Sequence, residues 1–215
     1  NIIIAAGKTV TLDLGTYTIT PSESFEFGMY MLFINRGTFT IKGEGTIDSR
    51  GDNFPNYVIQ NEGGQLEILS GKYIANWNAV RNISGSLKIS GGEFSNVATS
   101  SNREDSAIYS STGSVEISGN AQIHGLNTAV RAYGSTVTVS GNASLSGAFG
   151  VMLFNNPLDN TPTTRHSSLT MTGGTISATN GFALSGNNMQ SALCSAEITG
   201  GTLTSIDEAT GIYWP

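Results

Sequence analysis

Apolar and polar residues alternate along short segments of this chain, and each segment reaches a corner containing glycine before a second apolar segment begins. The clearest copy spans residues 115–123, with a Gly119-Asn120-Ala121 corner, and it returns at residues 137–145 around Gly141-Asn142-Ala143. Alternation with a period of two predicts β-strands. The constant shift between the two copies predicts a repeat architecture.

Eight segments follow this pattern of strand, glycine corner and second strand. They are residues 10–20, 39–49, 66–76, 87–97, 115–125, 137–147, 169–179 and 196–206. A third apolar element follows most of them, at Val80, Ile108, Val130, Val151, Leu184 and Ile212. We therefore expect three short strands in each repeat.

A repeat of this length favours a parallel β-helix over other β architectures. A propeller blade needs about 40 residues and four strands, and an antiparallel meander needs tight hairpin turns between neighbours. We expect an all-β solenoid with one domain over residues 1–215, built from about eight coils of three short strands. Coils that stack about 4.8 Å apart would give a rod of roughly 40 Å.

Stacked coils should align equivalent side chains into columns. We expect one inward column made of Ile41, Ile68, Ile89, Ile117, Val139, Met171 and Ile198. The neighbouring outward residues Glu67, Lys88 and Glu116 alternate in charge. This alternation favours the proposed register, because opposite charges on adjacent strands attract each other.

Several of these segments resemble a known family. AAGKTVTLDLGTYTIT, GTFTIKGEGTIDS, YVIQNEGGQLEILSGKY and LKISGGEF are similar to the pectate-lyase-like β-helix repeats of bacterial cell-surface proteins and some phage structural proteins. The resemblance covers essentially the whole chain and implies a right-handed parallel β-helix. Its motifs are structural ones, so the resemblance by itself implies no catalytic residue.

The amino-acid composition limits the kinds of molecule that the chain could bind and indicates where it is located. Only 12% of residues are charged and the net charge is −6, which argues against nucleic acid because phosphate binding needs clustered Lys and Arg. Glycine is abundant, with 27 residues, and the polar positions are mostly Ser, Thr and Asn, as in many extracellular β proteins. No apolar run is long enough to cross a membrane. We predict an extracellular, cell-surface or virion location, as a mature form or a segment of a longer protein.

The single cysteine and the few histidines offer no metal site. Cys194 lies in a small apolar stretch, where we expect a buried side chain that only fills space. His124 and His166 have no neighbouring run of aspartates. We therefore expect no cofactor and no bound metal.

Insertions between the second and third strands should project from one edge of the rod. They cover residues 20–32, 49–57 and 98–106, while residues 155–167 emerge at a different corner. The candidate residues of this loop edge are Asp52, Phe54, Tyr57, Arg103 and Asp105. The aromatic residues either fold back as a hydrophobic lid or form a recognition edge.

An enzyme is one alternative, because β-helices also include polysaccharide lyases and glycoside hydrolases. A calcium-dependent lyase would need carboxylates that converge on a metal beside a basic group. Asp52, Glu104 and Asp105 could converge only if their two loops met, with Arg50 and Arg103 beside them. We favour the simpler interpretation, in which these charges are solvated and hold the loops together.

A binding site for sugars has better support. Outward positions of the third strand carry Arg81, Tyr109, Arg131 and Met152 in successive coils, with Trp77 and Tyr133 at the margins. Sugars stack on aromatic faces and hydrogen-bond to guanidinium groups. The same stripe could instead be a structural ladder in which each guanidinium covers a neighbouring ring.

The sequence thus supports three functional hypotheses. The first is a non-catalytic adhesion or structural module that binds a glycan or a host surface. The second is a polysaccharide-cleaving enzyme. The third is a filament subunit that stacks end to end, suggested by the apolar residues 2–4 and 212–214 near the two ends of the rod.

Overall fold

The strands of the chain stack side by side in three columns. The structure is a computed structural model that describes residues 1–22, 31–50, 57–97, 105–154, 166–186, 194–205 and 211–214. Within these ranges it contains 21 β-strands and no helix. The first column consists of β2 (Thr9–Asp13), β5 (Thr38–Lys42), the second halves of β7 (Tyr57–Ile68) and β9 (Asn78–Ile89), β12 (Gly113–Ile117), β15 (Ser135–Val139) and the first parts of β18 (Ser168–Ala178) and β20 (Ser195–Ser205).

The other two columns are built in the same way. The second consists of β3 (Thr18–Ile19), β6 (Thr46–Asp48), β8 (Lys72–Ala75), β10 (Glu93–Asn96), β13 (Gln122–Gly125), β16 (Ser144–Gly147) and the last parts of β18 and β20. The third consists of β1 (Ile2–Ile4), β4 (Met31–Asn35), the first halves of β7 and β9, β11 (Ser106–Ser110), β14 (Thr128–Tyr133), β17 (Phe149–Phe154), β19 (Leu184–Ser185) and β21 (Ile212–Tyr213).

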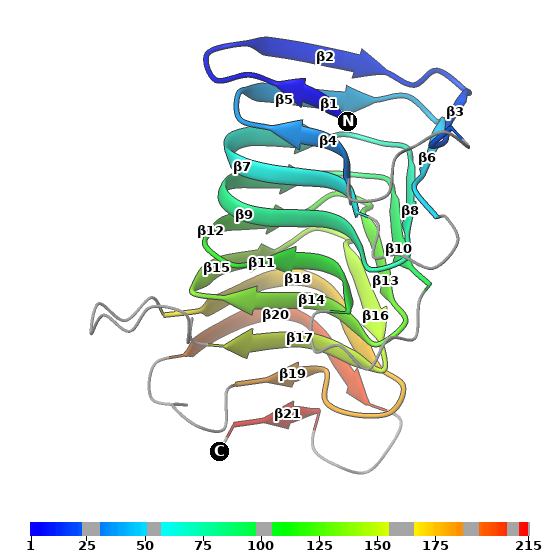
Figure 1. The fold of residues 1–215 in the computed structure, drawn as a ribbon. Helices are drawn as coiled ribbons and strands as arrows, with labels where there is room; N and C mark the ends of the chain where they lie inside the picture. The colour runs from blue at the N-terminus through cyan, green and yellow to red at the C-terminus, as the bar shows by residue number, and fades with distance from the viewer. Residues whose placement is uncertain are drawn as a thin grey trace.

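Every strand pairing among the described residues is parallel, and the chain advances steadily along the stack. Figure 1 shows this advance from β1 and β2 in blue to β20 and β21 in red. The expectation of an all-β fold with parallel strands is confirmed, and the arrangement is consistent with a parallel β-helix. The apolar residues Ile2, Ile3 and Ile4 form a strand that pairs with β4, because they occupy the third column ahead of the first anchor segment.

Inward side chains stack into rows, as the sequence predicts. Ile41, Ile68 and Ile89 are consecutive partners in the first column, and the row continues through Ile117, Val139 and Met171, all fully buried. Ile198 continues the row in register with Met171, as expected, but it is 40% exposed. The reason is that β20 has a first-column neighbour on only one side among the described strands.

Two aromatic rings stack in the core of the second column. Tyr73 and Phe94 are register partners, and their rings stack with centroids 4.6 Å apart and an interplanar angle of 6°. The Tyr73 hydroxyl donates to the Ser70 carbonyl at 2.8 Å, so the one polar atom of this buried ring is satisfied. Burial raises the pKa of Tyr73 above its ordinary value.

A buried polar ladder runs along the corner between the third and first columns. Asn35 donates from Nδ2 to Asn61 Oδ1 at 2.8 Å, Asn61 donates in the same way to Asn82 at 2.8 Å, and Asn82 donates to Ser110 Oγ at 3.1 Å. All four residues are fully buried. Each amide also reaches carbonyl oxygens of the turn, so the ladder satisfies polar groups that the corner would otherwise leave without partners.

Glycine is required at the corner between the first and second columns. Gly119 and Gly141 have φ angles of +59° and +65°, which side chains rarely adopt. A Cβ at Gly119 would also lie 2.0 Å from the carbonyl oxygen of Ser90 on the neighbouring turn. The repeated Gly-Asn-Ala corner therefore keeps adjacent turns in close contact.

Candidate functional site: an aromatic and arginine stripe on the third column

The stripe expected from the sequence lies on the third column, in register. Arg81, Tyr109, Arg131 and Met152 are consecutive partners on β9, β11, β14 and β17. Gln60 of β7 precedes Arg81 in the same row. Side chains one turn apart stand about 4.8 Å apart, so each can reach its neighbour.

Arg81 lies between two tyrosine rings. The guanidinium carbon is 5.1 Å from the ring centroid of Tyr57 and 5.4 Å from that of Tyr109, within range of cation–π attraction. Nη1 also lies 3.5 Å from Gln60 Oε1. The side chain is thus held in one orientation from both sides.

A second set of contacts continues below Tyr109. Its ring centroid is 5.6 Å from that of Tyr133, which in turn stacks on Phe154 at 4.7 Å and 13°. The Arg131 guanidinium carbon lies 5.2 Å from the centroid of Phe154, and Nη2 is 3.7 Å from the sulfur of Met152. Phe154 is not among the residues predicted from the sequence, although it aligns with Tyr133 of the preceding repeat.

Much of the stripe is not accessible to solvent. Three residues are buried: Tyr57 at 5%, Tyr109 at 5% and Arg131 at 7% exposure. Five others are half-buried: Trp77, Arg81, Tyr133, Met152 and Phe154. The Trp77 ring meets that of Tyr57 edge-on, at 6.1 Å and 69°. The ring of Tyr109 is therefore covered by its neighbours in the stripe, and the half-buried residues are the ones that can contact a ligand.

A polar network extends the stripe towards the corner with the first column. Arg36 Nε donates to Glu62 Oε2 at 2.8 Å, and Gln60 Nε2 donates to Glu62 Oε1 at 2.5 Å. Burial raises the pKa of Glu62, but the hydrogen bonds from Arg36 and Gln60 outweigh it, so the pKa lies below that of an ordinary glutamate. Glu62 is thus held in its charged form and orients Gln60, which lies one turn before Arg81.

The loop edge expected from the sequence is described only in part. Asp52, Phe54 and Arg103 lie outside the described residues. Asp105 is buried, with 1% exposure, and Tyr57 belongs to the stripe instead of a separate edge.

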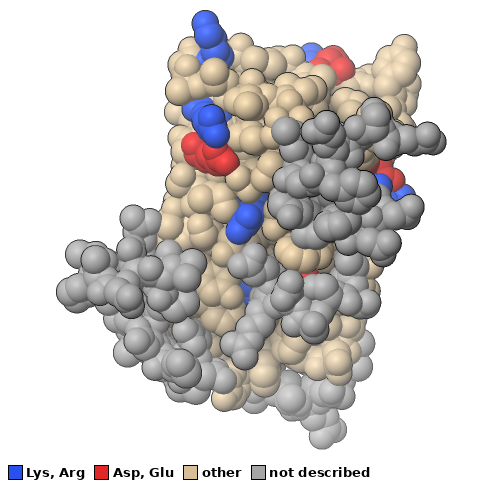
Figure 2. Space-filling view, viewed as in Figure 1, with Lys and Arg blue, Asp and Glu red and all other residues tan. Residues whose placement is uncertain are grey.

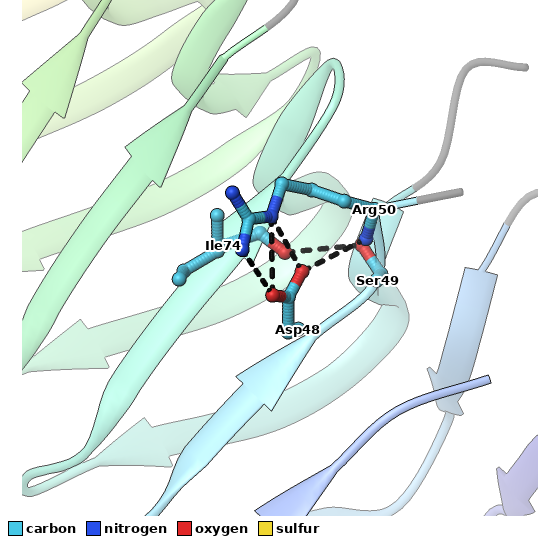
Figure 3. Close-up of polar contacts among 4 residues, drawn as sticks. All are labelled: Asp48, Ser49, Arg50 and Ile74. Carbon is cyan, nitrogen blue, oxygen red and sulfur yellow. Dashed lines mark hydrogen bonds and ion pairs between the residues drawn. The ribbon is translucent and has the colours of Figure 1, made fainter. Parts of the chain in front are cut away.

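Asp48, the last residue of β6, forms an ion pair with Arg50, two residues later in the chain. Arg50 binds Asp48 through Nε at 2.9 Å and Nη2 at 2.5 Å, and its backbone N–H donates to Asp48 Oδ1 at 3.0 Å (Figure 3). These hydrogen bonds, the side-chain one first, hold the pKa of Asp48 below its usual value despite partial burial. Ser49 donates from its backbone N–H to the Ile74 carbonyl of β8 at 2.8 Å. The geometry anchors the strand end to the next turn.

Three other carboxylates each form an ion pair with a lysine of an adjacent turn. Lys42 meets Asp13 at 3.3 Å, Lys72 meets Glu93 at 3.4 Å and Lys88 meets Glu116 at 3.8 Å. Figure 2 shows the described charged side chains of one face as few and scattered. Within the described ranges no three His, Cys, Asp or Glu residues gather in a way that could hold a metal ion.

The remaining candidate residues are ordinary parts of the surface or core. His124 Nδ1 lies 3.0 Å from Ser146 Oγ on the exposed side of the second column. Cys194 is buried, as expected from the sequence. The described part of the chain contains no helix long and apolar enough to span a membrane.

Comparison with protein families, curated proteins and solved structures finds no match for the chain.

Proposed function

We propose that the chain is a non-catalytic structural or adhesion module of an extracellular protein. In this proposal it is a right-handed parallel β-helix of eight coils and belongs to the pectate-lyase-like repeats that its sequence resembles. The registered parallel columns and the buried side-chain rows support that assignment.

The contacts within the stripe carry the functional part of the proposal. Arg81 lies between Tyr57 and Tyr109, and Arg131 lies over Phe154, so successive turns are joined on the outside of the rod as well as through its core. Ion pairs such as Lys88–Glu116 join successive turns in the same way on the first column. Such contacts favour a stiff rod that presents a fixed surface. They are less expected in a site that rearranges around a substrate.

Attachment to a glycan is the specific activity we propose for this rod. The half-buried residues Trp77, Arg81 and Tyr133 would form the contact, with an indole face for a sugar ring and a guanidinium for its hydroxyl or carboxylate oxygens. Tyr109 and Arg131 would support this surface from below. The chemical partner is then a carbohydrate at a cell or host surface.

The test is binding to a glycan array by the wild-type chain and two variants. We expect Trp77→Ala to lose at least tenfold in affinity for any bound glycan. Tyr109→Phe should bind like the wild type, because it keeps the ring that lies under Arg81. Equal binding by wild type and Trp77→Ala, or no binding by the wild type, would overturn the glycan site.

The same samples test the non-catalytic part of the proposal. Each glycan is incubated with the wild-type chain, with and without calcium, and assayed for new reducing ends and for unsaturated products. We expect neither. Product formation that depends on protein concentration would show a polysaccharide-cleaving enzyme instead.

A further inference from the structure

The chain contains two Asn-x-Ser sequences, the acceptor pattern for asparagine-linked glycans. They are Asn82-Ile83-Ser84 and Asn142-Ala143-Ser144. The sequence does not distinguish them, but the structure places them in opposite environments.

Asn82 is part of the buried ladder. Its Nδ2 donates to Ser110 Oγ at 3.1 Å and to the Thr112 carbonyl at 3.3 Å, while its Oδ1 accepts from Asn61. The residue is fully buried. A sugar on Nδ2 would replace one of the amide hydrogens that the ladder uses, so the folded chain has no room for a glycan here.

Asn142 lies on an exposed corner between β15 and β16. Gly141, at φ +65°, turns the backbone outward, and the Asn142 N–H donates to the Gly119 carbonyl at 2.8 Å. Its Nδ2 makes an exposed hydrogen bond of 3.2 Å to Asn120 Oδ1. Ser144 follows at the start of β16 and is half-buried. The acceptor amide is thus presented on a rigid turn at the surface.

We propose that Asn142 is an acceptor site for an asparagine-linked glycan when the chain is exported past an oligosaccharyltransferase. The donor is an oligosaccharide linked to a lipid pyrophosphate. Asn142 Nδ2 forms a bond to the anomeric carbon, the bond from that carbon to the pyrophosphate oxygen breaks, and the proton lost from Nδ2 leaves with the lipid pyrophosphate. The proposal depends on the extracellular part of the proposed function and not on glycan binding.

The location of Asn142 keeps its glycan away from the stripe. The Asn142 corner joins the first column to the second. Arg81 lies on the third column, and Trp77 lies just before the strand that carries Arg81. A glycan on Asn142 would therefore shield the first and second columns and leave the stripe open.

The first experiment compares two matched serine variants. The full chain, with a secretion signal, is produced in eukaryotic cells, and intact mass is measured on secreted and retained protein before and after amidase treatment. Ser144→Ala should remove the single oligosaccharide mass. Ser84→Ala, which removes the other acceptor pattern and leaves the Asn82 side chain in place, should keep it.

The site is assigned by release in heavy-oxygen water, which marks the former acceptor as a labelled aspartate. We expect the label at position 142 in the secreted chain. An unmodified wild-type chain, or a label at position 82 in secreted protein, would overturn the proposal.

A second experiment tests whether the turn itself presents the acceptor. Asn120 occupies the same exposed turn one repeat earlier but is followed by Gln122. Adding Gln122→Thr to Ser144→Ala should move the glycan from position 142 to position 120. No modification of that double variant would contradict the role assigned to the turn. Equal binding of glycosylated and Ser144→Ala chains to the array would show that this site and the stripe are independent.

Discussion

The Asn61 side chain donates a hydrogen bond of 2.8 Å to Asn82 Oδ1 in a corner that contains no exposed atom of either residue. The same amide reaches the Gly64 and Ser84 carbonyls, so one side chain joins two turns of backbone. An amide presents both a donor and an acceptor, so the pattern can repeat from turn to turn. The ladder fixes the register of β7 against β9.

Removing the centre of this ladder should be costly. Asn61→Ala leaves buried donors and acceptors of Asn35, Asn82 and the turn without partners, and we expect a loss of about 3 kcal/mol in the free energy of unfolding. Asn120→Ala removes an exposed amide pair and should change it by less than about 0.5 kcal/mol. Denaturant titration measures both, and equal losses would argue against the importance of burial.

Two isoleucines in one row should differ in their contribution to stability. Ile117 is fully buried between turns, so Ile117→Ala should cost between about 2 and 5 kcal/mol by leaving a cavity. Ile198 stands in the same row but is 40% exposed, so Ile198→Ala should cost about 1 kcal/mol. The comparison uses thermal and denaturant unfolding. A larger loss at Ile198 would mean that the end of the row is covered in solution.

Charge order on the first column should affect stability in a salt-dependent way. Lys88 stands in register between Glu67 and Glu116, so Lys88→Glu places three like charges in a row. We expect a loss of about 1 kcal/mol at low salt that shrinks in high salt. Adding Glu116→Lys restores one attractive pair and should recover part of the loss. A salt-independent loss would indicate a packing effect.

The Asp48–Arg50 pair should contribute to stability at neutral pH and not in strong acid. Because the folded pKa of Asp48 is lowered, its contribution is complete above the unfolded value of about 3.9 and is lost as pH falls through the folded pKa. Asp48→Asn should therefore lower the melting temperature at pH 7 and converge with the wild type below that range. The contribution is at most about 1 kcal/mol because Arg50 is half exposed.

Arg50→Gln is the matched control, since it removes the partner and leaves the carboxylate. Its pH profile should resemble that of Asp48→Asn, because both variants lack the ion pair. A difference between wild type and Asp48→Asn that stayed constant down to strong acid would contradict the sign of the pKa shift.

The strand pattern and much of the register can be predicted from the order of residues alone. Alternation with a period of two identifies residues such as Ile89 and Ile117 as inward, and the repeat pairs them across adjacent turns. The order of Glu67, Lys88 and Glu116 along the column was predicted in the same way, and Lys88 and Glu116 form the expected pair. Each of these features depends on local periodicity, which the chain carries without any tertiary information.

Which side chains are accessible to solvent depends on the folded arrangement and could not be predicted from the sequence. Arg81, Tyr109 and Arg131 were placed in one stripe by their spacing, but their burial depends on what surrounds each ring, and Tyr109 is covered while Arg81 is partly exposed. The buried ladder through Asn61 and Asn82 was missed for a related reason. An asparagine near a turn looks like a surface residue in the sequence, and only the stacking of turns encloses it. Periodicity fixes which way a residue points, whereas burial and partner come from chain segments that are distant in sequence.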